Sequence, residues 1–490
     1  MNVLARRVVP GLVWLLAGWS PAVAGAQPES APAPRSEAAL PAPVALALRS
    51  LDLPESGVSV WVQRLGDDAP LVRFNADVPR NPASTLKLVT TFAALEGLGP
   101  AYTWHTDVHL ATPLQDGVVA GDVWLRGHGD PFLVAEEYWK LTDALRRRGL
   151  RRIEGDLVFD TSFFDLPPED RGAFDDQPDR VYNLPPHPLL VNFNAVRFSV
   201  RPEEGGGAVS VAPDPPLPNL ELANRLRLYR APCGGYQRGV ALAVRDPDVR
   251  DHVLLEGRFP DGCDEYALTR TVLQPESYAF GLFDLYWHQL GGEIAGRWRT
   301  APVPDPEARP FLRHRSRPLG ELLRLVNKYS NNVMTRHLGL TLGAERFGAP
   351  ATEDKARDAI FEVLGEHGVD TAGLVVSNSA GLSRDSRITA RQLAAVLDAG
   401  WRSPFMPEFL SSLSIPGLDG TMRRRLAGTP AAGRMHLKTG SLDHVSAVAG
   451  YVLTRDGERV MVVVLVNAPE AHRGLGEDLE DVVLRWAMDL

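Results

Sequence analysis

Two kinds of hydrophobic spacing alternate near the start of the chain. Apolar positions within 59–63 and 71–74 predict two short strands. From Ser84 onward, apolar residues recur at the spacing of a helix, and this pattern predicts a helix that stops at Gly97.

Helical spacing returns beyond Pro310. The helices that it predicts cover 319–326, 332–342, 356–364 and 389–397. The chain then ends in a predicted hairpin, with strands at 445–454 and 459–466, followed by a last helix at 476–488.

The stretch between about 100 and 300 has a different character. Turns rich in Gly, Pro and Asp alternate with short β-like runs such as 121–125 and 155–159, and no fixed repeat period is present. We therefore expect an α/β (α+β) body that is interrupted by a mostly β insertion.

The first 44 residues indicate an export signal and a leader. Arg6 and Arg7 precede a short apolar run at 8–19 and small residues at 22–26, which is typical of a signal peptide over 1–26. An uncleaved membrane anchor is the alternative, although the run is shorter than the roughly 20 residues that span a bilayer. Residues 27–44 are rich in Pro, Ala and Glu and predict a flexible leader. No later stretch is long and apolar enough to predict an integral membrane span.

Composition narrows the class of protein. The 490 residues include 61 acidic and 52 basic side chains, for a net charge of −9, so nucleic acid is not expected as the main partner. The only two cysteines, Cys233 and Cys263, lie close in sequence, and in an oxidising compartment they are expected to form one disulfide. Two separate buried thiols are the alternative.

The first motif with chemical meaning is Ser84-Thr85-Leu86-Lys87, at the start of the predicted helix. A Ser three residues before a Lys lies on the same helix face, within hydrogen-bond reach. A neutral Lys can activate the hydroxyl as a nucleophile, and the helix N-terminus favours an oxyanion beside it. The ordinary alternative is an N-capping Ser followed by a solvated Lys.

The second motif is Ser330-Asn331-Asn332, which lies between two predicted helices. A hydroxyl can pass a proton to a leaving amine, and a carboxamide can both donate to and accept from a substrate amide. A capping Ser followed by surface Asn residues is the alternative, and this motif is weak when taken alone.

The third motif is Lys438-Thr439-Gly440-Ser441, directly before the predicted strand at 445–454. A cation and a hydroxyl at a sheet edge can bind a carboxylate, while Gly allows a ligand to approach the backbone. Only five of the 52 basic residues are Lys, so a match by chance is rare, although a strand-edge Lys before a turn is the ordinary alternative.

The three motifs, each present once and in this order, resemble the penicillin-binding and class A β-lactamase set. The long gap between Lys87 and Ser330 is similar to that of class C low-molecular-mass penicillin-binding proteins, the D-alanyl-D-alanine carboxypeptidase/endopeptidase family. The resemblance extends to three further stretches, 127–131, 191–194 and 417–421. Asn331 departs from the usual Asp of the middle motif, and 378–383 departs from the family's usual loop.

This resemblance implies a fold and a set of domains. The fold is a penicillin-binding/β-lactamase-like catalytic domain, with an antiparallel sheet flanked by helices, interrupted by mostly β inserted domains. The implied domains are a catalytic domain (45–99 and 308–490), inserted domain II (100–193 and 271–307) and a nested inserted domain III (194–270) that holds both cysteines.

The resemblance also implies a mechanism. Ser84 is the nucleophile, Lys87 the base that Lys438 helps to keep neutral, and Ser330 the proton relay. Asn332 holds the substrate amide, Lys438 and Thr439 bind the terminal carboxylate beside Gly440, and the backbone N–H groups of Ser84 and Ser441 form the oxyanion hole. Which group is the true base differs between accounts of this superfamily.

The expected activity is therefore that of a periplasmic serine D,D-peptidase that acts on peptidoglycan peptides and is acylated by β-lactam antibiotics. The alternatives are a β-lactamase or esterase on the same fold, and a non-catalytic cell-wall binding protein. No cofactor is expected, and no metal, because the 12 His residues include no His-Glu-x-x-His arrangement. His128 and His337 are predicted to be structural.

Overall fold

The computed structural model describes residues 39–203, 207–245 and 251–490. The predicted signal peptide and most of the predicted leader lie outside these residues. Within the described ranges, no helix has the length and apolar character needed to cross a membrane.

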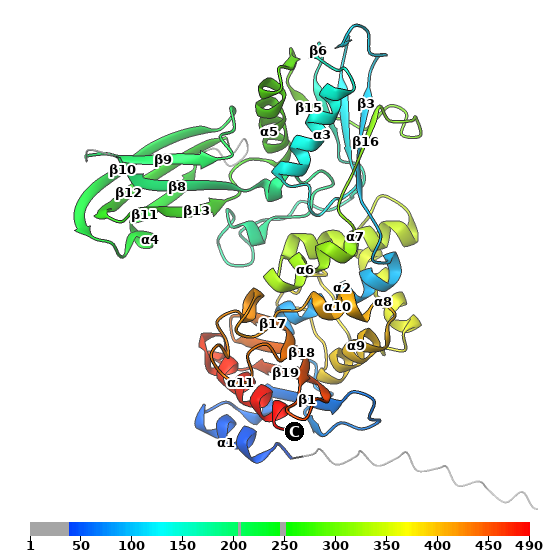
Figure 1. Ribbon diagram of the computed structural model, residues 1–490, viewed down its shortest axis with the longest axis vertical. Coiled ribbons are helices and arrows are strands. Elements are labelled where there is room, and N and C mark those ends of the chain that lie inside the picture. The colour runs from blue at the N-terminus through cyan, green and yellow to red at the C-terminus, as the bar shows by residue number, and fades with distance from the viewer. Residues whose placement is uncertain (1–38, 204–206, 246–250) are drawn as a thin grey trace, which may run out of the picture. The chain divides into compact units, whose positions relative to one another are not determined.

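A five-stranded antiparallel sheet forms the centre of the catalytic body, in the order β17-β18-β19-β1-β2 (Figure 1). Its strands are β1 (Val58–Arg64), β2 (Val72–Phe74), β17 (Met435–Leu442), β18 (Val445–Leu453) and β19 (Arg459–Asn467). The predicted strands and the C-terminal hairpin are confirmed, with Val445 of β18 opposite Asn467 of β19.

Both faces of this sheet are buried, because alternate residues of each strand enter different cores. Met461, Val463 and Leu465 pack under one group of helices, and Val462 and Val464 pack against another. The first group contains α2 (Lys87–Leu98), α6 (Leu319–Tyr329), α7 (Asn332–Phe347), α8 (Glu353–Glu366), α9 (Ala390–Arg402) and α10 (Met406–Ser411). The second contains α1 (Ala42–Ser50) and α11 (Leu475–Met488).

Two boundaries differ from the predictions. The helix does not stop at Gly97: α2 continues to Leu98 and ends before Gly99, which adopts a left-handed φ of 79°. Gly97 lies inside the helix, where it allows close packing against α7: a Cβ at this position would lie 2.5 Å from the Leu342 side chain. The leader is also shorter than predicted, because 42–44 belong to α1, where Val44 is buried.

Between α2 and α6 the chain forms four more sheets. Their orders are β15-β7-β5-β3-β16, β14-β6-β4, β13-β8-β9 and β10-β12-β11. Their strands are β3 (His105–Leu110), β4 (Val118–Val119), β5 (Val123–Gly127), β6 (Arg152–Ile153), β7 (Leu157–Asp160), β8 (Val196–Pro202), β9 (Val209–Asp214), β10 (Glu221–Pro232), β11 (Val240–Val244), β12 (His252–Gly262), β13 (Tyr266–Arg270), β14 (Glu293–Ile294), β15 (Trp298–Thr300) and β16 (Leu312–Arg315). The predicted strand-rich character of this stretch is confirmed.

Helices also contribute to this stretch, which the sequence did not predict. They are α3 (Ala135–Arg147), α4 (Tyr236–Gly239) and α5 (Pro275–Gln289). α3 connects the parallel strands β5 and β7, and buried residues of α3 and α5 share a core with the strands. The domain boundaries at 100, 194, 271 and 308 stay a prediction.

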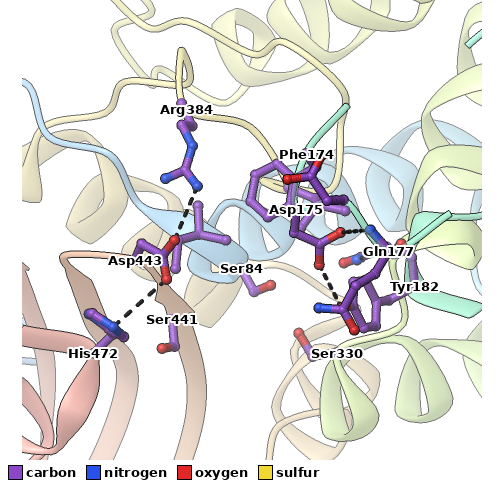
Figure 2. A pocket seen from close by; sticks show the side chains of 14 residues that line it. Ser84, Phe174, Asp175, Gln177, Tyr182, Ser330, Arg384, Ser441, Asp443 and His472 are labelled. Atoms are coloured by element: carbon purple, nitrogen blue, oxygen red, sulfur yellow. Dashed lines mark hydrogen bonds and ion pairs between the residues drawn. The ribbon is translucent and has the colours of Figure 1, made fainter. Parts of the chain in front are cut away.

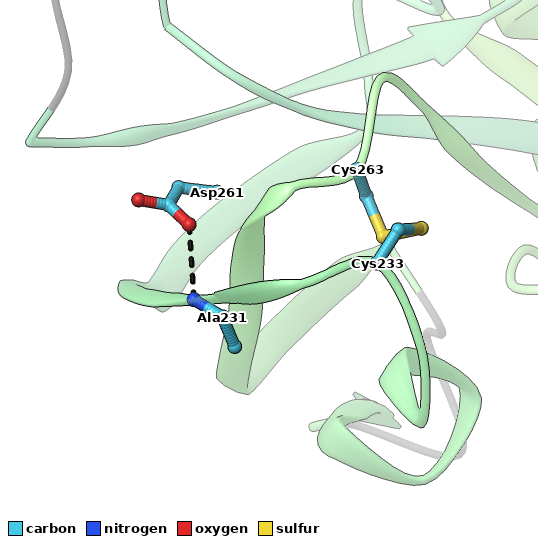
Figure 3. Close-up of a disulfide and its surroundings, with 4 residues drawn as sticks. All are labelled: Ala231, Cys233, Asp261 and Cys263. Atoms are coloured by element: carbon cyan, nitrogen blue, oxygen red, sulfur yellow. Dashed lines mark hydrogen bonds between the residues drawn. A yellow bond between two sulfur atoms is a disulfide. The ribbon is translucent and has the colours of Figure 1, made fainter.

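Cys233 and Cys263 form a disulfide that links the ends of β10 and β12 (Figure 3). These two strands are parallel neighbours, and Asp261 accepts a hydrogen bond from the backbone N–H of Ala231 at 3.0 Å beside the disulfide. The disulfide thus links the C-terminal ends of two adjacent parallel strands.

Candidate active site

Ser84 lies in a short 3₁₀ turn (Ala83–Leu86) that leads directly into α2. Ala83 before it adopts a left-handed φ of 45°, which is unfavourable for a residue with a side chain. Asn81 stabilises this turn, because its Oδ1 accepts from the Ala83 N–H at 2.8 Å. Asn467 at the end of β19 binds the Asn81 backbone in turn, accepting from its N–H and donating to its C=O. The turn that presents Ser84 is therefore fixed to the central sheet.

The Lys87 amine contacts three groups. Whether each group can donate or only accept decides where the N–H bonds and the lone pair of the amine point. Nζ lies 2.9 Å from Ser84 Oγ, 2.7 Å from Asn332 Oδ1 and 2.6 Å from the Ala380 carbonyl oxygen. The last two oxygens can only accept, so they take two N–H donors of the amine. In a neutral amine the remaining position is a lone pair, and it faces the Ser84 hydroxyl. Lys87 is thus placed to accept the Ser84 proton.

Burial makes the neutral form of Lys87 accessible. The side chain is fully buried, and burial holds its pKa well below the ordinary value of a lysine. The charge of Lys438 lowers the Lys87 pKa further. The sequence predicted this like-charge effect, and the structure adds that burial is the larger cause.

Ser330 is held in place by the end of one helix and the start of the next. It terminates α6 in the left-handed conformation, with φ 55°. Lys328 anchors the end of α6, because its Nζ donates to Asp419 Oδ2 at 2.6 Å and to the Leu413 carbonyl at 2.8 Å. Asn331 caps α7 by accepting from the Met334 N–H at 3.1 Å. Asn and Asp cap helices about equally well, which explains why Asn331 is tolerated in the middle motif.

Lys438 approaches Ser330 from β17, the edge strand of the central sheet. Its Nζ donates to Ser330 Oγ at 2.9 Å and to the Thr439 carbonyl at 2.6 Å. An ammonium has three donors, so the third is available to a ligand. Burial lowers the pKa of Lys438 to about 7. The next side chain, Thr439, donates from its hydroxyl to Thr421 Oγ1 at 2.8 Å.

Two glycines allow close approach of the backbone to the Ser84 turn. A Cβ on Gly440 would lie 2.7 Å from the Pro82 carbonyl oxygen and 2.9 Å from the Ser84 nitrogen. A Cβ on Gly381, which has a φ of 75°, would lie 2.1 Å from the Ala83 carbonyl oxygen. Side chains at either position would therefore displace the turn that carries Ser84.

Several of the predicted site residues border a cavity of about 760 Å³ (Figure 2). Ser84, Ser330, Asn332 and Ser441 line its floor. One wall comes from the segment between β7 and β8 and contains Phe174, Asp175, Asp176, Gln177 and Tyr182. The opposite wall contains Arg384, Asp443 and His472. The inserted stretch of chain thus completes a cavity whose floor belongs to the catalytic body.

Hydrogen bonds tie the inserted wall to the floor. Asn332 Nδ2 donates to the Tyr182 carbonyl at 3.1 Å, and the Tyr182 hydroxyl donates to Asp175 Oδ2 at 2.6 Å. The Arg384 guanidinium lies 5.1 Å from the ring centre of Phe174, and Arg384 pairs with Asp443 at 3.3 Å. The two walls therefore meet above the floor through Arg384.

The structure brings all the predicted site residues together, although it does not test their roles. Four line the cavity, Lys87 and Lys438 lie buried behind it, and Thr439 and Gly440 continue the edge strand. Asn81, Asn467 and Tyr182 carry no signal in the sequence, because each acts through contacts across more than 100 residues. Thr421 lies in a stretch that resembles the family, and Ala380 lies in the loop that departs from the family's usual pattern; no role was predicted for either.

Comparison with known proteins agrees with this arrangement. The family model described as the D-Ala-D-Ala carboxypeptidase 3 (S13) family matches residues 41–488. A D-alanyl-D-alanine carboxypeptidase of Actinomadura sp. (strain R39) is 30% identical over 399 residues, which cover 78% of this chain and 72% of that protein. The D-alanyl-D-alanine carboxypeptidase DacB of Haemophilus influenzae is 23% identical over 85% of this chain and 86% of its own.

The fold matches as well. The crystal structure of penicillin binding protein 4 (dacB) from Haemophilus influenzae has a TM-score of 0.76 and 23% identity, covering 91% of this chain and 99% of that chain. A second structure of that protein, complexed with a novel β-lactam, has a TM-score of 0.71 and 22% identity, covering 89% of this chain and 98% of that chain. The mixed α/β penicillin-binding fold with inserted domains is therefore confirmed. The chain belongs to the D-Ala-D-Ala carboxypeptidase 3 (S13) family, and it is a serine-type D,D-peptidase.

Proposed function

We propose that Ser84 is the nucleophile that cleaves the bond between two D-alanine residues of peptidoglycan peptides, with Lys87 as its base. The observation that carries this assignment is the position of Lys87 Nζ, 2.9 Å from Ser84 Oγ with both other partners obligate acceptors. This geometry leaves one direction for proton transfer, from Ser84 to Lys87.

Acylation then proceeds in two steps. Ser84 Oγ loses its proton to Lys87 and bonds to the carbonyl carbon, and the carbonyl oxygen gains the negative charge. The backbone N–H groups of Ser84 and Ser441 are the proposed donors to that oxygen, helped by the N-terminus of α2. When the carbon–nitrogen bond breaks, the oxyanion re-forms the carbonyl, and the proton taken by Lys87 is relayed through the Ser330 hydroxyl to the leaving amine. D-alanine departs, and Lys87 is neutral again. Water repeats the attack on the acyl-enzyme and releases the shortened peptide.

Lys438 and Thr439 are proposed to bind the terminal carboxylate. The free donor of Lys438 and the exposed end of the edge strand lie beside Ser441, which lines the cavity. Asn332 is proposed to hold the substrate amide, since it lies on the cavity floor with its carboxamide between Lys87 and Tyr182. The same groups would bind the carboxylate and amide of a β-lactam.

The charges of the walls suit a substrate that carries both signs. Asp175 and Asp176 lie on one wall, and Arg384, which pairs with Asp443, lies on the other. An amine on a peptide side group would find a carboxylate, and a carboxylate on it would compete with Asp443 for Arg384. Arg384→Ala should then raise the KM for such a peptide. The rate of acylation by benzylpenicillin should stay within about threefold of the wild type, because an exposed ion pair contributes little free energy. Equal losses for both substrates would assign Arg384 to the chemistry instead.

We further propose that the enzyme works in the periplasm. The sequence of residues 1–26 and the Cys233–Cys263 disulfide both support export to an oxidising compartment. N-terminal sequencing of the protein recovered from the periplasm should begin near residue 25 or 27.

Fluorescent penicillin labelling tests the proposed function. The wild type should form a stable adduct on Ser84, and Ser84→Ala should form none. Rapid turnover of the penicillin would favour the β-lactamase alternative, and folded wild type that never labels would refute acyl transfer. Release of D-alanine from peptides, compared with cleavage of cross-linked dimers, separates carboxypeptidase from endopeptidase activity.

A further inference from the structure

Two histidines lie close to one oxygen atom of an aspartate at the five-stranded inserted sheet. His105 and Asp107 lie two residues apart on β3, so their side chains share one face of the sheet. His128 directly follows β5, whose last residue, Gly127, is paired with Thr106 of β3. Strand pairing therefore brings His128 beside His105, and their ring centres lie 3.9 Å apart.

The distances from Asp107 to the two histidine rings are long for hydrogen bonds and are compatible with two edges of a metal site. Asp107 Oδ2 lies 3.5 Å from His128 Nε2 and 3.7 Å from His105 Nε2. Good N–H···O bonds are about 2.7–3.2 Å long. Ligand atoms about 2.0–2.1 Å from a tetrahedral zinc ion are separated from one another by about 3.4 Å. Both separations are therefore close to the edge of a metal tetrahedron.

The His128 ring nitrogen is also unpartnered. Among the residues that the structure describes, His128 Nε2 is buried and has no hydrogen-bond partner. Buried polar atoms are rarely left in this state, and an ion or water is a common reason for one. The nitrogen that lacks a partner is the one that faces Asp107 Oδ2.

Arg313 belongs to the same cluster, and its positive charge limits the affinity of the cluster for a metal cation. Its Nε and Nη2 each donate to one oxygen of Asp107 at 2.7 Å. A carboxylate has about four lone pairs, so Oδ2 retains one for another partner. The guanidinium thus orients the carboxylate, while its charge opposes a cation. For this reason we expect micromolar rather than nanomolar affinity.

We propose that His105, Asp107 and His128 bind one divalent transition metal ion of the zinc class, with the fourth position open to water. Two imidazoles and one carboxylate are the ligand types that such ions prefer. The site would join β3 to the end of β5, next to Gly129, whose carbonyl contacts His337 Nδ1 of α7 at 3.0 Å. The site would therefore lie near a contact between the inserted stretch and α7.

The site was missed in the sequence because its ligands do not form a linear motif. His105 and Asp107 come from one strand, and His128 comes from the end of another. Only the β3–β5 pairing register places them together. The prediction that His128 is merely structural would therefore be replaced by a ligand role.

Bound metal is first removed from the mature chain. Zinc is then titrated into it, and calorimetry measures the binding; this experiment tests the proposal. The wild type and His288→Ala, an exposed control on α5, should each bind one zinc ion per chain, and zinc should raise their thermal midpoint. His105→Ala and His128→Ala should bind more than tenfold more weakly, since even outer-shell changes cost about 10–100-fold. Cobalt in the wild type should give the visible absorption of a four-coordinate site.

Penicillin labelling checks that each variant is folded, because Ser84 does not belong to this cluster. If His128→Ala fails to label, His128→Gln replaces it with a side chain of similar length. Wild type that binds zinc only at millimolar concentration would overturn the proposal. Binding that both histidine variants retain at full affinity would overturn it as well, by placing the zinc elsewhere.

Discussion

Lys87 and His128 are both buried nitrogen bases, but their surroundings differ. Lys87 Nζ has three partners within 2.9 Å, and one of them, Asn332, is held by a further hydrogen bond to the Tyr182 carbonyl. His128 Nε2 has none among the described residues, although it faces a carboxylate oxygen at 3.5 Å. The Lys87 amine is fully hydrogen-bonded within the chain, whereas the His128 nitrogen has no hydrogen bond to the residues that the structure describes.

This difference indicates what each cluster can do. A fully bonded buried network fixes its donors and acceptors before substrate arrives, which is the requirement for electrostatic preorganisation. An incomplete network instead offers a lone pair to an incoming ion. The predictions below test the separation of the two clusters, in order of expected effect.

Removing the nucleophile should have the largest effect. Ser84→Ala should lower peptide hydrolysis by at least about 10⁴-fold and abolish covalent penicillin labelling, because no other group can form the acyl-enzyme. Mass spectrometry of the penicillin-treated protein measures the adduct. Ser441→Ala, which keeps the backbone N–H, is the matched control and should still be acylated. An adduct in Ser84→Ala would move the nucleophile to another residue.

Removing the base should rank second. Lys87→Ala should slow acylation by about 10²–10⁴-fold, the range of a general base. Stopped-flow measurement with a fluorescent penicillin gives the rate, and the exposed Lys140→Ala should match the wild type. Acylation of Lys87→Ala within a few-fold of the wild type would assign the base to another group.

Removing the carboxylate-binding charge should affect recognition more than chemistry. Lys438→Ala should raise the KM for a D-Ala-D-Ala peptide by about 10–100-fold, since a charged hydrogen bond contributes about 1.5–3 kcal/mol. A peptide amidated at its C-terminus should be much less sensitive to this substitution. If both peptides lose activity equally, Lys438 acts on Ser330 rather than on the carboxylate.

The smallest effect on catalysis should come from the histidine cluster. His128→Ala should leave the penicillin acylation rate within about twofold of the wild type, because surface and distant substitutions couple weakly. The same stopped-flow measurement applies, with and without added zinc. A loss of acylation of tenfold or more in folded protein would show that the two clusters are coupled.

The catalytic body was largely predictable from sequence. Its helices and strands follow plain apolar periodicity, and Ser84, Ser330 and Lys438 occur in short motifs whose chemistry is readable without coordinates. The sequence could not show that Lys87 has two obligate acceptors, because Ala380 contributes a backbone oxygen from 293 residues away. It also placed the helix stop at Gly97, since the close contact with Leu342 is not visible in a linear pattern.

The inserted stretch was less predictable. Its strands are short, several pair in parallel, and α3 and α5 are surrounded by turns. The wall residues Asp175 and Tyr182 lie in a long segment with little regular structure, so no periodicity marks them. The His105–Asp107–His128 cluster depends on strand register, which a single sequence does not specify.

The central claim is that neutral Lys87 takes the proton of Ser84, and the pH dependence of acylation tests it most directly. The limiting rate constant at saturating penicillin should rise with pH as Lys87 loses its proton, and the midpoint should lie well below 10.5, the ordinary value, because burial lowers the Lys87 pKa. Saturation with penicillin separates this step from binding by Lys438. A rate that rises to a plateau well below the ordinary lysine value would agree with the account. A rate that is independent of pH, or that rises only near the ordinary lysine value, would contradict it.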